Sequence, residues 1–491
     1  MGADSLAGAG STLKEMPGFH IENFGCRAAR ADGEAIAANL RALDQRQPFA
    51  ADVVVVNTCS VTAEADRAAR AFIRRAHRRN PDARIVVTGC YAQRAPEELA
   101  GLAGVAAVVG NSHKALAPKI ISALAHDAIP TALRPPALVP VASLLSASAS
   151  QSALLPSPPI WAPTWVDDRF AHSFIEDLHL PHSHLAPGAQ TRPNLKIQEG
   201  CGNRCTFCVI PFTRGPSKSL DSASVMRQVE AFAAAGGKEL VLSGINLGRY
   251  SSGSETLASL VRAIIRQTAL PRLRLSSIEP MDWGNDLIGL MREFGGSRLA
   301  RHAHLPLQSG SDTVLRRMHR RYRPWHYAEK VAALAGAAGP DLTLGADVMV
   351  GFPGETEREF DETLAFIRAL PFGYLHVFPF SARPGTRAWA LHAASPVPKA
   401  VVEERAAALH ALAAEKSQSH RKRFIGRELA AITLHTPAAL AAQGRTAALT
   451  ENFLPVELEA RMPANHMVQV AVTELTSGAA LVARETVHKS I

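Results

Sequence analysis

The stretch Leu195–Cys208, LKIQEGCGNRCTFC, joins a short apolar run to a loop that carries three cysteines. The run predicts a buried β-strand, and the loop after it places Cys201, Cys205 and Cys208 in a CxxxCxxC spacing. Three thiolates on one tight loop can hold three corners of a [4Fe-4S] cube and leave one iron open. A zinc site is the alternative, although Zn²⁺ takes four ligands and no second cysteine pair follows this loop.

Further apolar runs alternate with helix-length segments from residue 191 to residue 420. After the cysteine loop these runs are KELVLSGINLG, LRLSSIEP, RHAHLPLQSG, LTLGADVMVGFPGE and YLHVFPFSARPGT. Such a series predicts a full or partial (βα) barrel, whose active site lies at the C-terminal ends of the strands. The cysteine loop follows one of these strands, so we expect it at that end of the barrel.

Residues 17–126 contain three more strand-like runs, each ending in a cysteine. FHIENFGC ends at Cys26, DVVVVNTC at Cys59 and ARIVVTGC at Cys90, and helix-length segments separate them. This pattern predicts a doubly wound parallel sheet built from βαβ units. Because parallel strands share one carboxyl edge, the three thiols should converge there and form a second three-thiolate site. Inert buried cysteines are the alternative.

The rest of the chain divides into an irregular segment and a β-rich end. Residues 127–190 are rich in Ala, Pro and Ser without a helical or strand period, which indicates a linker or insertion. Its four histidines have no companion cysteine, so an irregular loop is favoured over a metal site; they are His172, His179, His182 and His184. Residues 421–491 read as short strands, which predicts a small β-barrel.

Composition limits the class of protein. A chain of 491 residues exceeds what one hydrophobic core usually serves. Its formal charge of +9 favours polyanionic partners. Six cysteines are too few for a disulfide framework, and a reducing cytoplasm would keep them available to metals. We find neither a signal sequence nor an apolar run long enough to span a membrane, so we expect a cytoplasmic protein without membrane contact.

Two arginine-rich segments could contact nucleic acid, with an ordinary solvated face as the alternative. In EADRAARAFIRRAHRRN, helical spacing places four residues on one face, namely Ala69, Phe72, Ile73 and Ala76. It leaves the arginines largely outward; these are Arg67, Arg70, Arg74, Arg75 and Arg78. A second basic patch is predicted from Arg316, Arg317, Arg320, Arg321 and Arg323.

Several segments carry a resemblance that covers nearly the whole chain. They are NTCSVT (Asn57–Thr62), VVTGCYAQ (Val86–Gln93), KIQEGCGNRCTFCVIPFTRGPSKS (Lys196–Ser219), LSGINLG, HLPLQSGSD, DVMVGFPGE and FSARPGTRA. Together they resemble the radical S-adenosylmethionine (SAM) methylthiotransferase family. NTCSVTAEADRAAR followed by NPDARIVVTGCYAQ is most similar to the MtaB subgroup, which modifies N6-threonylcarbamoyladenosine at position 37 of tRNA.

The resemblance implies a methylthiotransferase domain, a radical SAM domain and a TRAM-like RNA-binding barrel. It implies two [4Fe-4S] clusters, SAM, the tRNA anticodon stem-loop, a reducing electron donor and a sulfur donor. Cys201, Cys205 and Cys208 would hold the SAM-cleaving cluster. The second cluster would be held by Cys26, Cys59 and Cys90. No further catalytic residue is assigned. Expected SAM contacts are Phe207, Ser243, Gly244, Gln308, Ser309, Asp347 and Gly351.

Other functions stay open at this point. Within the same chemistry, the target could be isopentenyladenosine in tRNA or a side chain of a ribosomal protein. From other classes, the chain could be a non-catalytic iron–sulfur RNA-binding protein or a zinc-dependent RNA-modifying enzyme.

Overall fold

The computed structural model describes residues 18–46, 49, 51–127, 162–175, 190–476 and 480–486. Its N-terminal part contains a parallel five-stranded sheet in chain order: β1 (Phe19–Asn23), β2 (Val53–Thr58), β3 (Arg84–Gly89), β4 (Val105–Gly110) and β5 (Thr164–Trp165). α1 (Arg27–Arg46) and α5 (Ala117–Ala125) pack on one face. α2 (Ala63–Arg79) and α4 (Pro96–Ala100) pack on the other. Helices on both faces confirm the predicted doubly wound sheet.

The central part is a partial barrel of parallel strands, as predicted. Its strands are β6 (Asn194–Glu199), β8 (Glu239–Gly244), β11 (Arg272–Leu275), β12 (His302–His304), β13 (Thr343–Val350) and β14 (Phe372–Pro379). A bridge joins Leu273 of β11 to Leu299, in the segment that leads into β12, and so brings its two sheets together. Its helices are α7 (Ile210–Arg214), α8 (Ser222–Ala234), α9 (Leu257–Gln267), α10 (Asn285–Phe294), α11 (Asp312–Arg317), α12 (Pro324–Ala338), α13 (Glu357–Ala369) and α14 (Arg387–Ala394).

Alternation along the barrel strands separates two kinds of side chain. Leu240, Leu273 and Val348 belong to the large apolar core that the barrel helices cover. The neighbouring positions turn polar and charged groups to the opposite, inner face, among them Lys196, Glu239, Arg274, His302 and Asp347. Helix α1 of the N-terminal part packs against β6 and β8, and Lys196 bonds to Asp32 of that helix. The N-terminal part therefore borders the inner face.

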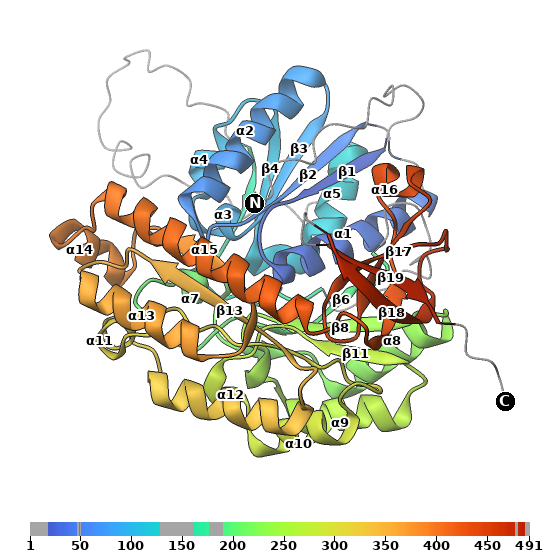
Figure 1. The fold of residues 1–491 in the computed structure, drawn as a ribbon. Helices are drawn as coiled ribbons and strands as arrows, with labels where there is room; N and C mark the ends of the chain where they lie inside the picture. The colour runs from blue at the N-terminus through green and yellow to red at the C-terminus, as the bar shows by residue number, and fades with distance from the viewer. Residues whose placement is uncertain are drawn as a thin grey trace, which may run out of the picture.

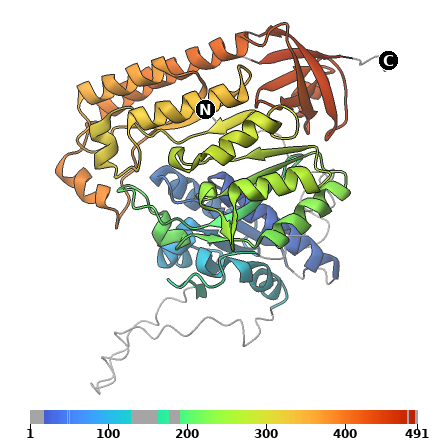
Figure 2. The ribbon, with the colours of Figure 1, turned by 90° about the horizontal axis from the view of Figure 1, so that it is seen from below.

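The C-terminal part is a closed barrel, as predicted. Its strands run in the order β15 (Glu428–Thr433), β16 (Thr446–Thr450), β17 (Pro455–Leu458), β19 (Leu481–Glu485) and β18 (Met467–Leu475). The long helix α15 (Lys399–Lys422) runs along the central part and leads into this barrel (Figures 1 and 2). Its β16–β17 loop contacts the central part, where Arg301 pairs with Glu451 and Asn452 Nδ2 donates to the Asp341 carbonyl at 3.0 Å.

Residues 162–175, which the composition places in an irregular linker, add β5 to the N-terminal sheet and bury Trp165, Phe170 and Ile175. His172 is exposed, 6.0 Å from the His113 ring centroid. His179, His182 and His184 lie outside the described residues. Among the described helices, none has the length and apolarity that a bilayer crossing needs.

Candidate functional site

The CxxxCxxC loop leaves β6 through a turn that only glycine fits. Gly200 has φ +69°, and a Cβ there would lie 2.0 Å from the Pro216 carbonyl oxygen. The Cys201 N–H donates to the Gly215 carbonyl at 3.1 Å, and Thr206 Oγ1 donates to the Arg317 carbonyl at 3.0 Å. The pKa of Cys208 is raised to about 12, mainly by burial and to a smaller extent by the two neighbouring thiols. The structure thus brings the three thiols of this loop together.

Nitrogen donors are directed at the sulfur atoms of this loop. Asn203 N and Asn246 Nδ2 lie 3.4 and 3.7 Å from Cys201 Sγ. Arg320 Nη1 lies 3.2 Å from Cys205 Sγ, and its Nη2 pairs with Glu279 at 2.5 Å. Hydrogen bonds to sulfur stabilise thiolates and tune the potential of a bound iron–sulfur cluster. These contacts are what a cluster site requires.

The position of Arg320 corrects the second predicted basic patch. Arg320 is buried at the cysteine loop, and most of the other arginines are paired with carboxylates. Arg316 and Arg323 pair with Asp312, and Arg317 pairs with Glu359. The segment therefore holds the loop in place instead of presenting a free cationic surface.

The three N-terminal cysteines also converge, at the carboxyl edge of the sheet. Cys26 follows β1, Cys59 follows β2, and Cys90 begins α3 (Cys90–Arg94) directly after β3. Gly25 has φ +110°, and a Cβ there would lie 2.7 Å from Cys59 Sγ, so only glycine lets the Cys26 segment approach so closely. Burial, and then Cys26 and Cys90, raises the pKa of Cys59 to about 12. The expectation of a shared edge is met in the geometry.

Donors also point at these sulfurs, and some come from the central part. Arg214 Nε lies 3.2 Å from Cys90 Sγ, Asn111 Nδ2 lies 3.4 Å from the same atom, and Val61 N lies 3.5 Å from Cys59 Sγ. Arg214 also pairs with Asp32 at 3.1 Å and with Glu199 at 2.8 Å. This buried network joins the N-terminal thiols to the end of β6.

The two triads suit iron–sulfur cubes better than zinc. All six cysteines are free thiols. In the described part of the chain, only His304, Asp347 and His376 place three such ligand atoms within 4.8 Å of one another. Each thiol triad is spread more widely than that, whereas zinc–sulfur bonds of about 2.3 Å bring sulfurs within roughly 4 Å of each other. A polynuclear cluster with one open corner fits this spacing.

The expected SAM contacts fall into two groups. Ser243 Oγ and Gln308 Oε1 are buried without a hydrogen-bond partner among the described residues, as groups awaiting a ligand would be. Ser309 Oγ instead bonds to Thr363 at 3.0 Å, and the Gly351 N–H donates to Glu355 at 2.9 Å, so both are used internally. Gly244 ends β8 against Gln198, and Phe207 packs half-buried on the core.

Asp347 lies within a polar group on the inner face. His304 Nε2 and His376 Nδ1 each lie 3.2 Å from an Asp347 oxygen. Burial raises the pKa of Asp347, but the hydrogen bonds from the two histidines outweigh this effect, so the pKa is lowered overall. Tyr374 Oη bonds to His302 at 2.8 Å and to His304 at 2.9 Å. The Asp347 group could hold a metal ion, but its members already satisfy one another.

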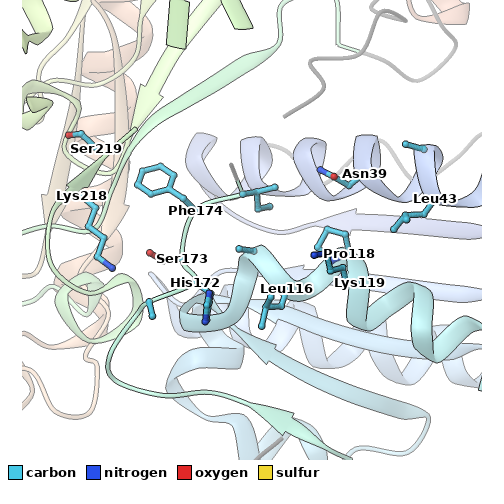
Figure 3. A pocket seen from close by; sticks show the side chains of 14 residues that line it. Asn39, Leu43, Leu116, Pro118, Lys119, His172, Ser173, Phe174, Lys218 and Ser219 are labelled. Atoms are coloured by element: carbon cyan, nitrogen blue, oxygen red, sulfur yellow. The ribbon is translucent and has the colours of Figure 1, made fainter. Parts of the chain in front are cut away.

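A cavity lies apart from both triads, between α1, the Asn111–Leu116 turn with α5, residues 171–175 and Lys218–Ser219 (Figure 3). Asn39, Lys119 and His172 line it. None of the expected cluster ligands or SAM contacts does so.

Helix α2 presents a basic stripe, as its sequence predicts. Asp66, Ala69 and Ile73 are buried, whereas Arg67, Arg74, Arg75 and Arg78 are exposed. Arg70 differs, because it pairs with Glu98 at 2.8 Å and bonds to Tyr91.

Residues 18–110 match the family described as "uncharacterized protein family UPF0004", and residues 195–367 match the radical SAM superfamily. The chain is 35% identical over 470 residues to "threonylcarbamoyladenosine tRNA methylthiotransferase MtaB" of Treponema pallidum (strain Nichols), covering 90% of this chain and 95% of the relative. It is 31% identical to "tRNA-2-methylthio-N(6)-dimethylallyladenosine synthase" of Cereibacter sphaeroides (strain ATCC 17029 / ATH 2.4.9), covering 85% and 87%.

Among solved structures, the chain is similar to the radical SAM methyltransferase TsrM from Kitasatospora setae, with 15% identity and a TM-score of 0.47, covering 72% of this chain and 68% of that one.

Proposed function

The chain belongs to the MtaB family of radical SAM methylthiotransferases, and we propose that it installs a methylthio group at C2 of N6-threonylcarbamoyladenosine at position 37 of tRNA. One observation carries this proposal: six free thiols gather in two separate triads, and each triad receives hydrogen bonds from arginine and asparagine side chains. A non-catalytic RNA-binding protein would need neither an open iron nor two triads.

In this proposal Cys201, Cys205 and Cys208 hold the cluster that binds SAM, and Cys26, Cys59 and Cys90 hold the second cluster. The bound clusters and SAM supply the radical and the sulfur that an unactivated aromatic C–H requires. The chain contributes binding and position. Ser243 and Gln308 offer buried polar atoms to SAM, and Arg320 and Arg214 hold anionic sulfurs in place.

The domains divide the work. Residues 17–126 form the methylthiotransferase domain, 127–190 a linker or insertion, 191–420 the radical SAM domain and 421–491 a TRAM-like RNA-binding barrel. The α2 stripe and the C-terminal barrel bind the anticodon stem-loop, whose unpaired adenosine can leave its stack and enter the site. The reaction draws on a reducing electron donor and a sulfur donor in the cytoplasm, where the thiols stay reduced.

Nucleoside mass spectrometry on tRNA tests the proposal. Cells that lack the gene should lose the methylthio form of threonylcarbamoyladenosine, and the wild-type gene should restore it while Cys208→Ala does not. Loss of methylthio-isopentenyladenosine, or of a methylthio group from a ribosomal protein, would instead identify one of the alternative substrates.

A further inference from the structure

Arg27 connects the N-terminal thiols to the inner face of the central barrel. It follows Cys26 directly and begins helix α1. Its guanidinium carbon lies 5.5 Å from the ring centroid of Phe453, in the β16–β17 loop, and within electrostatic range of Tyr374 and Asp347. Its side chain makes no hydrogen bond or ion pair with any residue that the structure describes.

Cationic groups outnumber carboxylates around Arg27. The single carboxylate of Glu239 pairs with Arg192 at 3.2 Å, Arg272 at 3.4 Å and Arg274 at 2.8 Å. Arg274 lies 5.3 Å from the Phe453 ring, on which Arg27 also rests. Asp347, the other nearby carboxylate, is already bonded to His304 and His376. Arg27 therefore lacks a carboxylate of its own.

Two further nitrogen atoms at this place are unpaired as well. Arg274 Nη1 and His302 Nδ1 are buried without a hydrogen-bond partner among the described residues. His302 stacks on Phe453 with ring centroids 4.3 Å apart. A half-buried guanidinium without a counter-ion beside the fully buried Arg274 is costly, so this junction of Arg27, Arg274, His302, Tyr374 and Phe453 is set up to receive an anion.

The junction adjoins the expected reaction site from two sides. Arg27 is next to the cluster ligand Cys26. Asp347, whose charge acts on Arg27, accepts a backbone hydrogen bond at 2.8 Å from Gln308, an expected SAM contact. An adenine whose C2 lies between the two triads would thus carry its N6 substituent near this junction.

We propose that Arg27 is a specificity-determining residue that binds the free carboxylate at the end of the N6 substituent, so that the enzyme selects adenosines whose N6 group ends in a carboxylate. This inference rests on the proposed function. A carboxylate can accept two hydrogen bonds from one guanidinium, and the Phe453 ring supports the guanidinium plane. An apolar dimethylallyl group would cover Arg27 and leave it unpaired, which disfavours that group.

The test uses two synthetic anticodon stem-loops that differ only at the substituent terminus. One carries threonylcarbamoyladenosine, and the other carries the threoninamide analogue, in which an uncharged carboxamide replaces the carboxylate. Reconstituted full-length wild type, Arg27→Gln and Arg27→Lys are compared, with Arg41→Gln as the matched control because Arg41 is exposed on the same helix. Kd without SAM and kcat/KM with SAM are measured for both loops.

Wild type and Arg41→Gln should favour the carboxylate loop by roughly 10- to 100-fold in Kd and kcat/KM, the range of a charge-assisted hydrogen bond. Arg27→Gln should lose that preference by weakening only for the carboxylate loop, and Arg27→Lys should regain part of it. Iron content should not change.

The inference would be overturned if Arg27→Gln weakened Kd and kcat/KM equally for both stem-loops. It would also be overturned if wild type showed no preference for the carboxylate loop. If wild type binds but methylthiolates neither loop, the proposed function fails, and the Kd ratio alone decides the inference: equal Kd values overturn it.

Discussion

Arg214 donates its Nε–H to Cys90 Sγ at 3.2 Å and thereby joins the last thiol of the N-terminal sheet to the central barrel. The same guanidinium pairs with Asp32 and Glu199, while Lys114 and Lys196 pair with Asp32 from other elements. The second triad is thus fixed relative to the first by side chains from both parts of the chain.

Arg214→Ala should lower the free energy of unfolding by roughly 3–5 kcal/mol, because it leaves a cavity at a fully buried side chain and removes the hydrogen bonds that Asp32 and Glu199 accept from it, although Lys114 and Lys196 still pair with these carboxylates. Arg316→Ala removes an exposed arginine paired with Asp312 and should cost about 0–1 kcal/mol. Urea unfolding of the full chain measures both. If both variants lost a similar free energy of unfolding, the buried network around Arg214 would contribute no more to stability than an exposed ion pair.

Replacing Arg74, Arg75 and Arg78 with glutamine should weaken binding of the anticodon stem-loop, because each side chain is exposed and has no ion pair within the described residues. The slope of log affinity against log salt should become less steep by about 2, with roughly 0.7–0.9 lost per phosphate contact. The matched control replaces exposed arginines paired elsewhere, namely Arg262, Arg266 and Arg358. An unchanged slope in the α2 variant would assign RNA contact to another surface.

His420 should make stability depend on pH near neutrality. Burial, and after it Arg423 and Arg421, lowers its pKa from 6.5 to about 4, and its ring bonds to Thr343 at 2.9 Å. When the pH falls below 6.5, the His420 imidazole is protonated in the unfolded chain but stays neutral in the folded protein. The free energy of unfolding therefore falls as the pH drops from 6.5 toward 4.

Between about pH 7.5 and pH 5 the wild type should lose roughly 2 kcal/mol more than His420→Gln. Urea unfolding at the two pH values measures this difference. Equal losses in both proteins would contradict a neutral, buried His420.

The elements around the thiols could be predicted because their signals are local. Apolar runs end at Cys26, Cys59 and Cys90, and parallel strands place such ends on one edge. The loop Cys201–Cys208 carries its spacing in the sequence itself. The same reasoning identified the strands of the closed C-terminal barrel.

Contacts between distant segments could not be predicted. Arg214 and Asp32 are 182 positions apart, and no local pattern pairs them. Arg320 looked like one member of a solvated basic cluster, because a run of arginines gives no sign of which one is buried against Cys205. Similarly, nothing periodic in the linker indicated that Thr164–Trp165 completes the N-terminal sheet.

The iron content of anaerobically reconstituted protein tests most directly whether two triads each hold one cube. Wild type should contain about eight irons per chain. Replacing Cys26, Cys59 and Cys90 with alanine should leave about four irons and preserve the formation of 5'-deoxyadenosine from SAM. Replacing Cys201, Cys205 and Cys208 with alanine should also leave about four irons, but it should abolish the formation of 5'-deoxyadenosine. About four irons in wild type, or no loss on removing the N-terminal triad, would contradict the account.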